Sequence, residues 1–515
     1  MPQIPTVTIS VVDNGASAAL SVPQANVQLK VGVAVGGPIN QPVATSNPQT
    51  LQTAFIGGPL VEAGGLVCQA GNICIAVGIP LVTKGTAYAV QATVPGGSTS
   101  AVTTTLDATY GAWDTFYVKT RCLTGGTIGT PGIIIQTSLD AGRNWGAPIS
   151  LGTATSLYLG NGSVSTQVIG GTGVQLNFGA GTMVAGDSWQ FGTVAPAGNA
   201  AGKIAALAAF QASQYGVAGV GSMHSVGDTM HGGASDLESA NIQTQLQAGV
   251  AIYEFDRCIV ELRDALAPTA WGGSGETEAT WIAALATAMS GLTAQPRVCP
   301  DGGYYNTPSP FANPAGGLPS YRRPLAWSHA VRRTQISLQR RAGRVKDGPY
   351  STITVSAATD PTDGFIYHDE RVNPGLNAAR IGSGMTWPKK GAGFFHCQEP
   401  LLAAPGSQFV ELAIGNVLDV ACDIGYAAGV EEVSDDLLTQ ANGTLDPVAL
   451  NTFQADIQQA ENQGMIQTPL VSKVTVTVSA TANVNATGII PVTVSVLPRG
   501  YVNAVAETIN LSQGG

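Results

Sequence analysis

Both ends of the chain carry short segments in which hydrophobic and polar residues alternate. The first is Thr6–Val12, and the other two are Lys473–Ser479 and Val492–Val496 near the C-terminus. Alternation with a period of two residues predicts a strand with one buried face. A lone strand or hairpin is marginal in water, so these segments need partner strands from this chain or from another copy of it. If the partners come from another copy, the two ends of the chain are connectors between subunits.

The hydrophobic side of these segments consists of valines and one isoleucine. Two interpretations are open for this side: inter-subunit strands, or an ordinary sheet within the chain. The positions concerned are Val7, Ile9, Val11, Val474, Val476, Val478, Val492, Val494 and Val496.

A different apolar pattern begins at residue 31. Val31–Val35 is a short β-branched run closed by glycines, and Ile73–Val77 is a fully apolar run typical of a buried strand. Between them, Leu51–Ala70 has hydrophobic residues at positions suited to a helix, interrupted at Gly57–Pro59. The pattern predicts a β-α-β unit.

From about Gly96 to Gly192, short strand-like runs alternate with turns rich in Gly, Ser, Thr and Asn. Several short strands at this spacing favour a compact β-sandwich. Because helical patterns resume after Pro196, we interpret this region as an insertion. The predicted strands are Phe116–Thr120, Gly132–Thr137, Ser156–Leu159, Val174–Phe178 and Ser188–Phe191.

The second half of the chain is mainly helical in its pattern. The last predicted helix begins with Asp446 before Pro447, an N-cap residue followed by proline in the first turn. The predicted helices are Asn199–Tyr215, Ser235–Leu266, Glu276–Leu292, Arg322–Arg344, Gln408–Ala427 and Pro447–Gly464, with a short strand at Arg297–Cys299.

Together these elements predict an α/β (α+β) fold with a mixed-sheet core, helices, an inserted all-β domain and terminal arms whose strands need partners. The predicted limits are 1–25 for the N-terminal arm, 26–92 for the first part of the core, 93–196 for the inserted β-sandwich, 197–465 for the second part of the core and 466–515 for the C-terminal strands and arm.

Charge is scarce for a chain of this size. Only 11% of the 515 residues are charged, against about 25% in an ordinary soluble domain, so the surface must be largely neutral. A neutral surface lacks the repulsion and desolvation cost that oppose self-association, a condition that an obligate oligomer tolerates. The formal net charge of −10 argues against a general nucleic-acid binder, because phosphate affinity needs clustered Lys and Arg.

No targeting or membrane segment is predicted. The first 24 residues have no basic region followed by a continuous apolar one, so we expect no secretory signal peptide. No stretch is long and apolar enough to span a bilayer, and we expect a soluble chain made in the cytosol without direct membrane insertion.

The seven cysteines are scattered over the whole length, and none is in C-x-x-C spacing. Most are expected to be small buried hydrophobic residues. The alternative is that some form disulfides between subunits after leaving the reducing cytosol. The candidates are Cys68, Cys74, Cys122, Cys258, Cys299, Cys397 and Cys422.

The sequence offers no recognised catalytic, cofactor-binding or metal-binding motif. The five histidines do not form H-E-x-x-H, and neither a phosphate-binding G-x-x-x-x-G-K-[ST] nor a nucleophile G-x-S-x-G occurs. The tightest group is His368-Asp369-Glu370, which is more typical of a solvated loop or helix start than of a metal or general-base site. We expect no enzyme activity, no cofactor and no metal.

One concentration of charge stands out. Eight basic residues lie between Asp301 and Asp347, with no acid among them. The first interpretation is a helix whose arginines pair with acids elsewhere in the fold, such as Glu254, Glu261 and Asp264. The second is a basic helix that contacts an acidic partner through bidentate guanidinium pairing. The basic residues are Arg322, Arg323, Arg332, Arg333, Arg340, Arg341, Arg344 and Lys346.

Six short segments stand in a characteristic order along the chain. They are Val31–Pro38 (VGVAVGGP), Asn40–Val43 (NQPV), Phe55–Leu60 (FIGGPL), Thr386–Phe395 (TWPKKGAGFF), Phe409–Ile424 and Pro498–Tyr501 (PRGY). By their order and spacing the chain resembles the sheath protein of contractile bacteriophage tails. The resemblance covers residues 1–90 and 197–515, and places the region 96–195 where an outer decoration domain is expected.

The resemblance implies a structural subunit that polymerises as stacked hexameric rings around a tail tube. Its terminal arms would add strands to sheets of neighbouring subunits, and contraction would drive the tube through the host envelope. The implied partners are other copies of the chain, the tail tube protein and the baseplate and tail terminator proteins, without nucleic acid. The implied location is the tail sheath of the virion, assembled in the host bacterial cytoplasm.

Two other functions are weighed against this one. A non-contracting tail or baseplate protein would form a closed ring that never stacks. A carbohydrate hydrolase on the particle surface would require paired carboxylates facing one another across a substrate. Asp369 and Glu370 are adjacent in sequence and are poorly placed for that arrangement.

Overall fold

The computed structural model describes residues 26–160, 171–215, 220–229, 237–311, 319–353, 363–404, 406–408, 410–433 and 436–501. These residues fall into two compact units, one reaching to Asn416 and the other beginning at Val417. The predicted N-terminal arm, with Val7, Ile9 and Val11, lies outside the described residues. The other predicted domain limits stay predictions.

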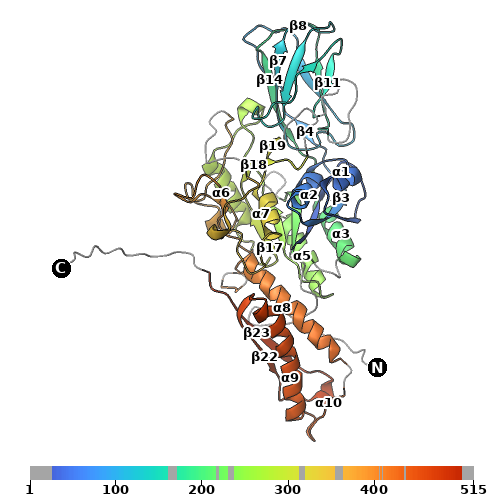
Figure 1. Ribbon diagram of the computed structural model, residues 1–515, viewed down its shortest axis with the longest axis vertical. Coiled ribbons are helices and arrows are strands. Elements are labelled where there is room, and N and C mark those ends of the chain that lie inside the picture. Colours follow the sequence, from blue (N-terminus) through green and yellow to red (C-terminus); the bar gives the residue numbers. More distant parts are fainter. Residues whose placement is uncertain are drawn as a thin grey trace, which may run out of the picture. The chain divides into compact units, whose positions relative to one another are not determined.

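A six-stranded sheet forms the centre of the first unit (Figure 1). Neighbouring strands are parallel, except that the last strand in the order is antiparallel to its neighbour. In spatial order the strands are β17 (Val298–Asp301), β16 (Cys258–Glu261), β15 (Ser222–Asp228), β1 (Val27–Val33), β3 (Ile73–Ile79) and β2 (Pro42–Thr45). Every residue of β1 is buried, as expected for a strand that is covered on both faces.

Helices cover both faces of this sheet. Leu29 and Val31 of β1 belong to a core that includes residues of α3, α5 and α6. Cys74 and Ala76 of β3 face the opposite way, into a core made with α1, α2 and α7. The helices are α1 (Pro48–Phe55), α2 (Pro59–Gln69), α3 (Ala200–Gln211), α5 (Leu237–Val250), α6 (Glu278–Met289) and α7 (Leu325–Arg333). The predicted β-α-β unit is present, because β1 and β3 are parallel neighbours joined through α1 and α2.

Two of the predicted helices are wrong in part. The helix expected over Ser235–Leu266 ends at Val250, and the run Cys258–Glu261 is the buried strand β16. A short apolar run has no periodicity that separates a buried strand from a buried helix. The helix expected over Arg322–Arg344 begins only after Pro324, because proline lacks an N–H and disfavours helical geometry in the residue before it. Its first residues belong instead to β19 (Ser320–Pro324), paired with β18 (Tyr304–Pro308).

The strand-rich region that follows β3 contains several antiparallel sheets around one hydrophobic core. The predicted strand Val174–Phe178 has the same bounds in the structure. The strands are β4 (Thr86–Ala87), β5 (Gln91–Thr93), β6 (Val102–Leu106), β7 (Tyr117–Thr124), β8 (Gly126–Thr127), β9 (Ile134–Ser138), β10 (Ile149–Ser150), β11 (Ser156–Tyr158), β12 (Val174–Phe178), β13 (Thr182–Met183) and β14 (Ser188–Val194). Two further short strands, β20 (Gly384–Met385) and β21 (Phe395–His396), pair later in the same unit.

The second unit is built from helices and one hairpin (Figure 1). The boundary between the units falls inside α8 (Leu412–Glu431). The unit continues with α9 (Pro447–Glu461), a π-helical turn over Asn462–Gln467, β22 (Val471–Val478), α10 (Val484–Thr487) and β23 (Val492–Pro498). Asp446 caps α9 as predicted, since its side chain accepts a hydrogen bond from the backbone N–H of Val448.

One helix corrects the expectation about membrane segments. By length and composition, α8 is apolar enough to cross a bilayer, with a mean hydropathy of 1.2 over its best window. Of that window, 61% is buried within the protein, and the helix carries Asp419 and Asp423 in its middle. A mostly buried core helix passes the same test of length and composition, so this observation is weak evidence for a membrane span.

Candidate assembly surfaces

The C-terminal valines form a hairpin within the chain. β22 and β23 pair antiparallel, with Val474 opposite Val496, Val476 opposite Val494 and Val478 opposite Val492. Val474, Val476, Val478 and Val494 are buried, and α9 packs against β22. The alternation seen in the sequence therefore gives this hairpin one covered face.

Glutamines of α9 cover the outer edge of β22, the edge that does not face β23. The side-chain oxygen of Gln458 accepts a hydrogen bond from the N–H of Val476 at 2.8 Å, and its amide nitrogen donates to the carbonyl of Val474 at 3.3 Å. Gln454 accepts from the N–H of Val478 at 3.2 Å. These side chains occupy backbone groups that another strand would need.

The outer edge of β23 is different. Ser479 donates its N–H to the carbonyl of Pro491, so this pair and every second pair before it are the hydrogen-bonded ones. The backbone groups of Val492, Val494 and Val496 therefore point away from β22. The sheet has two strands within the described residues, so this edge has no neighbouring strand there. It also carries no charged side chain along Val492–Pro498, and charge is a common protection of edge strands.

Within the described chain, the six C-terminal valines thus lie in an ordinary sheet within the chain, which was the alternative to inter-subunit strands. Strand addition from another copy at the outer edge of β23 stays a prediction.

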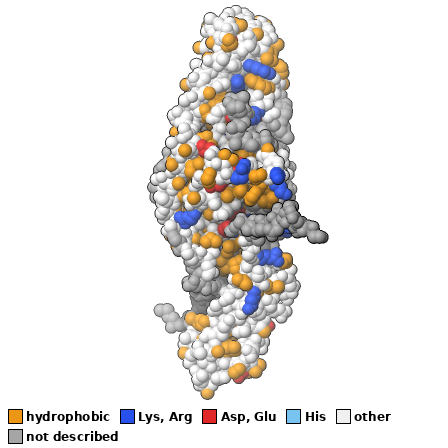
Figure 2. Space-filling model, turned by 90° about the vertical axis from the view of Figure 1, so that its left-hand side faces the viewer, with side chains coloured by type: hydrophobic (Ala, Val, Ile, Leu, Met, Phe, Trp, Pro, Cys, Tyr) orange, Lys and Arg blue, Asp and Glu red, His pale blue; other side chains and the backbone are white. Residues whose placement is uncertain are grey.

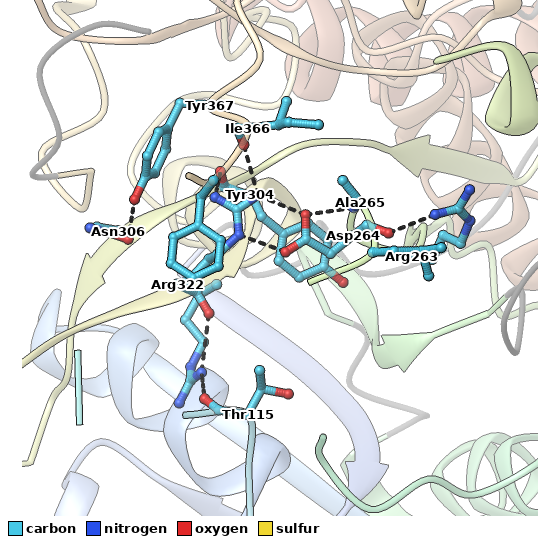
Figure 3. A network of polar contacts seen from close by, with 12 residues as sticks. Thr115, Arg263, Asp264, Ala265, Tyr304, Asn306, Arg322, Ile366 and Tyr367 are labelled. Carbon is cyan, nitrogen blue, oxygen red and sulfur yellow. Dashed lines mark hydrogen bonds and ion pairs between the residues drawn. The ribbon is translucent and has the colours of Figure 1, made fainter. Parts of the chain in front are cut away.

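The basic residues predicted on one helix are distributed over two elements and a loop. Arg322 lies on β19, where it donates two hydrogen bonds to the carboxylate of Asp264 at 2.6 and 2.7 Å (Figure 3). The same guanidinium donates to the carbonyl of Ile366 and lies over the ring of Tyr367. Despite burial, the Asp264 carboxylate keeps the pKa of Arg322 above its usual value.

Arg323 points into a second buried cluster. It donates to Glu62 of α2 at 2.7 Å and to the carbonyl of Thr115 at 2.7 Å, and lies 3.4 Å from Asp114. Burial raises the pKa of Asp114 to about 7, and the guanidinium opposes that rise. This arginine joins α2 of the core to the loop between β6 and β7 of the all-β region.

The other basic residues divide into buried and surface groups. Arg332 donates to the carbonyls of Asp347, Gly348 and Pro349, and Arg333 donates to Glu399. The interpretation of a partner-facing basic helix is therefore wrong for Arg322, Arg323, Arg332 and Arg333, which are buried in the protein. Arg341 pairs with Glu411 and is partly exposed, and Arg340 is exposed. For these two residues a partner contact stays a prediction.

His329 of α7 is the centre of an ion-pair network that no sequence motif indicates. Its Nδ1–H donates to Asp301 and its Nε2–H to Glu399, both at 2.7 Å. Although burial opposes the charged form, the two carboxylates raise the pKa of His329 to about 9. The charge of Arg333 and the hydrogen bond from His329 hold the pKa of Glu399 at about 2, although burial alone would raise it. The partners are far apart in sequence, so spacing could not reveal them.

A metal-like donor set includes the same histidine. Donor atoms of Cys299, Asp301 and His329 lie within 4.8 Å of one another. Both ring nitrogens of His329 already donate to carboxylates, so a metal ion would have to displace one of these bonds. The two carboxylates are balanced by the imidazolium and by Arg333, which makes the group a self-contained ion-pair network rather than a ligand set awaiting a cation.

His368-Asp369-Glu370 is buried and not the solvated loop that the sequence suggested. His368 bridges Glu278 and Glu370 at 2.8 and 2.9 Å, and Asp369 bonds Thr386. Glu370 also accepts N–H bonds from Gly375 and Asn377. These bonds fix the loops around β20, and Asp369 and Glu370 engage different partners instead of facing one another.

Three solved structures are compared with this chain. A sheath tail protein from Desulfitobacterium hafniense shares 11% identity at a TM-score of 0.40, covering 92% of this chain and 93% of the other. The contracted helical sheath of the anti-feeding prophage shares 10% identity at a TM-score of 0.44, with 99% of both chains covered. The contracted sheath complex of the PVC extracellular contractile injection system shares 9% identity at a TM-score of 0.48, covering 99% and 98%. All three are sheath proteins. Neither known protein families nor curated proteins give a match.

All seven cysteines lie in described residues, and six of them are buried. Burial raises the pKa of the Cys68 and Cys397 thiols to about 11. Cys397 alone among the seven has a partly exposed side chain, so the prediction of inter-subunit disulfides is most readily tested there.

Proposed function

We propose that this chain is the structural subunit of a contractile tail sheath, which polymerises through addition of terminal strands. The observation that carries the proposal is the outer edge of β23, which has no neighbouring strand among the described residues and which we call the open edge. A strand with unpaired, uncharged backbone on one side is a template for another strand. A sheath of this kind has no catalytic role, and we propose none for this chain.

The proposed occupant of the β23 edge is the segment Thr6–Val12 of another copy. Both segments have seven residues, so they match in length over about 23 Å. The hydrophobic side of the incoming strand, Val7, Ile9 and Val11, would continue the valine face of the hairpin. Gln454 and Gln458 cover the other edge, which favours addition at β23 over addition at β22.

The resemblance to tail sheath proteins suggests how such subunits assemble. The subunits would stack as hexameric rings around a tail tube, with baseplate and terminator proteins at the ends. Main-chain hydrogen bonds of added strands can persist while the subunit bodies move, because flexible segments between strand and body act as hinges. Contraction would then drive the tube through a host envelope.

The decisive experiment removes one N–H from the open edge. Val496→Pro deletes a backbone donor that points away from β22, so the hairpin should stay folded while strand addition is blocked. Deletion of residues 1–14 should have the same effect from the donor side. We expect tubes or stacked rings of the unmodified chain in electron micrographs, and dispersed folded subunits for both variants.

Ser495→Pro is the matched comparison, because the N–H of Ser495 belongs to a hydrogen-bonded pair within the hairpin and its loss should lower the stability of the second unit. A full-length chain that stays monomeric under all conditions contradicts the proposal. Closed rings that never stack would instead assign the chain to a non-contracting tail or baseplate component.

A further inference from the structure

The charges of this chain are divided unequally between its two units. Residues 417–515 contain ten Asp and Glu but only two Lys and Arg, whereas residues 21–416 contain 22 acidic and 21 basic residues. The net charge of −10 therefore resides almost entirely in the second unit and the N-terminal segment.

Burial makes the division sharper. Within the described part of residues 26–416, every charged residue that is exposed, rather than buried or partly buried, is basic. The acids among the described residues of this unit are buried or partly buried, and many are held in internal ion pairs such as Arg322–Asp264 and Arg263–Glu276. Its surface is therefore basic although its total charge is close to zero. Figure 2 shows one face of the protein, on which most of the surface is neither acidic nor basic. The few exposed charges therefore have few other charges around them on this face.

Six of the exposed bases lie on neighbouring segments, which we name the basic surface: Arg340, Arg344, Lys346, Arg371, Lys389 and Lys390. The partly buried Asp347 pairs with Arg344 at 2.7 Å and lies 3.8 Å from Arg340, so the six bases outnumber the acid among them.

Contacts between these segments hold the basic surface together. Arg371 donates to the carbonyl of Thr386 at 3.0 Å, at the start of the turn that carries both lysines. The same segment meets the loop after α7, where Tyr350 donates its N–H to Phe394 at 2.8 Å. Trp387 is 38% exposed between the bases and offers a flat ring for packing.

We propose that the basic surface binds the acidic second unit of a neighbouring copy. This inference rests on the proposed polymer, in which every copy brings both surfaces in equal number. The exposed acids include Glu431 and Asp456 of α8 and α9. Glu431 is the last residue of α8, where the helix dipole disfavours a negative charge, so its position is unfavourable for the helix alone.

Exposed ion pairs suit a contact that must rearrange. Each such pair contributes little and is screened by salt, unlike the buried pairs of Arg322 and Arg323. Several together give direction and register to a contact between large neutral surfaces. The basic surface would therefore select how copies approach, while the added strands keep them connected.

The test is a charge exchange in the full chain. Lys389→Glu with Lys390→Glu reverses the basic side, and Glu431→Lys with Asp456→Lys reverses the acidic side. Sedimentation measures the protein concentration needed for polymers at low and high salt. We expect each double variant to require about tenfold more protein at low salt, and the combination of all four changes to recover most of the loss.

Lys84→Glu is the matched control, because Lys84 is exposed in the same unit but outside the basic surface. Circular dichroism shows whether each variant is folded. Assembly of the first double variant with unchanged salt dependence overturns the inference. The inference is also overturned if this variant assembles like the unmodified chain and loses only the binding of nucleic acid. Failure of the unmodified chain to polymerise at all would refute the proposed function itself, and is distinguished by the unmodified sample alone.

Discussion

At the scale of single residues, the interior of the first unit is unusually rich in ion pairs for a chain with so little charge. His329 holds Asp301 and Glu399 together, and Arg323 holds Glu62 and Asp114. A buried charge that loses its partner costs far more than the pair contributes. These residues therefore support the fold chiefly because removing one of them would leave a buried charge without a partner.

The first prediction concerns His329→Gln, which removes the cation shared by two buried carboxylates and leaves only Arg333 beside Glu399. We expect a loss of about 3 kcal/mol in the free energy of unfolding at pH 7. The stabilisation linked to His329 is complete below its unfolded pKa near 6.5 and is lost as pH rises through about 9. That linked to Glu399 is complete above its unfolded value of 4.5 and is lost as pH falls through about 2.

Thermal unfolding of the unmodified chain and of His329→Gln across this pH range measures the loss of stability. His396→Gln is the matched comparison, since burial lowers the pKa of His396 to about 4 and the ring is neutral at pH 7. A loss as large for His396→Gln as for His329→Gln would contradict the assignment of the stabilising charge to His329.

The second prediction concerns Glu461 at the end of α9, whose two carboxylate oxygens are buried without a hydrogen-bond partner among the described residues. Burial raises its pKa to about 8. Stability linked to this group is therefore complete below pH 4.5 and is lost as pH rises through about 8. Glu461→Gln should stabilise the isolated subunit by about 2 kcal/mol at pH 8 and have little effect at pH 4.

Asp456→Asn is its control, because Asp456 is exposed on the same helix. Equal changes in melting temperature for Glu461→Gln at both pH values would show that the carboxyl is not the titrating group.

At the scale of elements, the C-terminal hairpin is asymmetric. Its hydrophobic alternation was visible in the sequence, but the covering of one edge by Gln454 and Gln458 was not. Glutamines on a helix carry no periodic signal, and their role appears only when α9 lies against β22.

The third prediction is that Gln454→Leu with Gln458→Leu opens the edge of β22. Two edges would then accept strands, and we expect irregular aggregates in place of uniform polymers, seen by electron microscopy and light scattering. Gln459→Leu adds the same hydrophobic side chain at an exposed position of α9 and should leave assembly unchanged. Uniform polymers from the double variant would show that the glutamines do not guard the edge.

Elements with a clear local pattern could be predicted from the sequence, whereas most contacts between distant residues could not. β12 and most of α6 followed from local pattern and turn residues. β16 was missed because a buried apolar run of a few residues has no diagnostic period. The arginines were visible as a group, and Asp264 was among the acids expected to pair with them, as it does with Arg322. Glu62 and Glu399, which lie 261 and 66 residues from their arginines, were not expected. Pairing over such separations depends on topology that one sequence does not contain.

At the scale of the whole molecule, the parallel-sheet core and the all-β region belong to one compact unit. Arg323 contributes to this unity by bonding both α2 and Thr115. Trp271, Tyr117 and Phe365 add an aromatic cluster between the same regions. We infer that the all-β region moves with the core as one body.

The fourth prediction is that Arg323→Ala weakens this unit by about 3–5 kcal/mol, because it strands two buried acids. Hydrogen exchange should show both regions losing protection together, since they share the cluster. Arg340→Ala removes an exposed arginine and should change stability by less than about 1 kcal/mol. Loss of protection in the all-β region alone would indicate independent folding.

The covered edge of β22 also sets the connectivity of anything built from this chain. If the N-terminal segment adds to the outer edge of β23, as proposed, each copy would join two others through unlike surfaces. Such head-to-tail contacts have no two-fold axis, so they cannot be completed by a dimer and must continue until a ring closes or another protein ends the series. A single pair of glutamines would thereby give the assembly a direction and two chemically distinct ends.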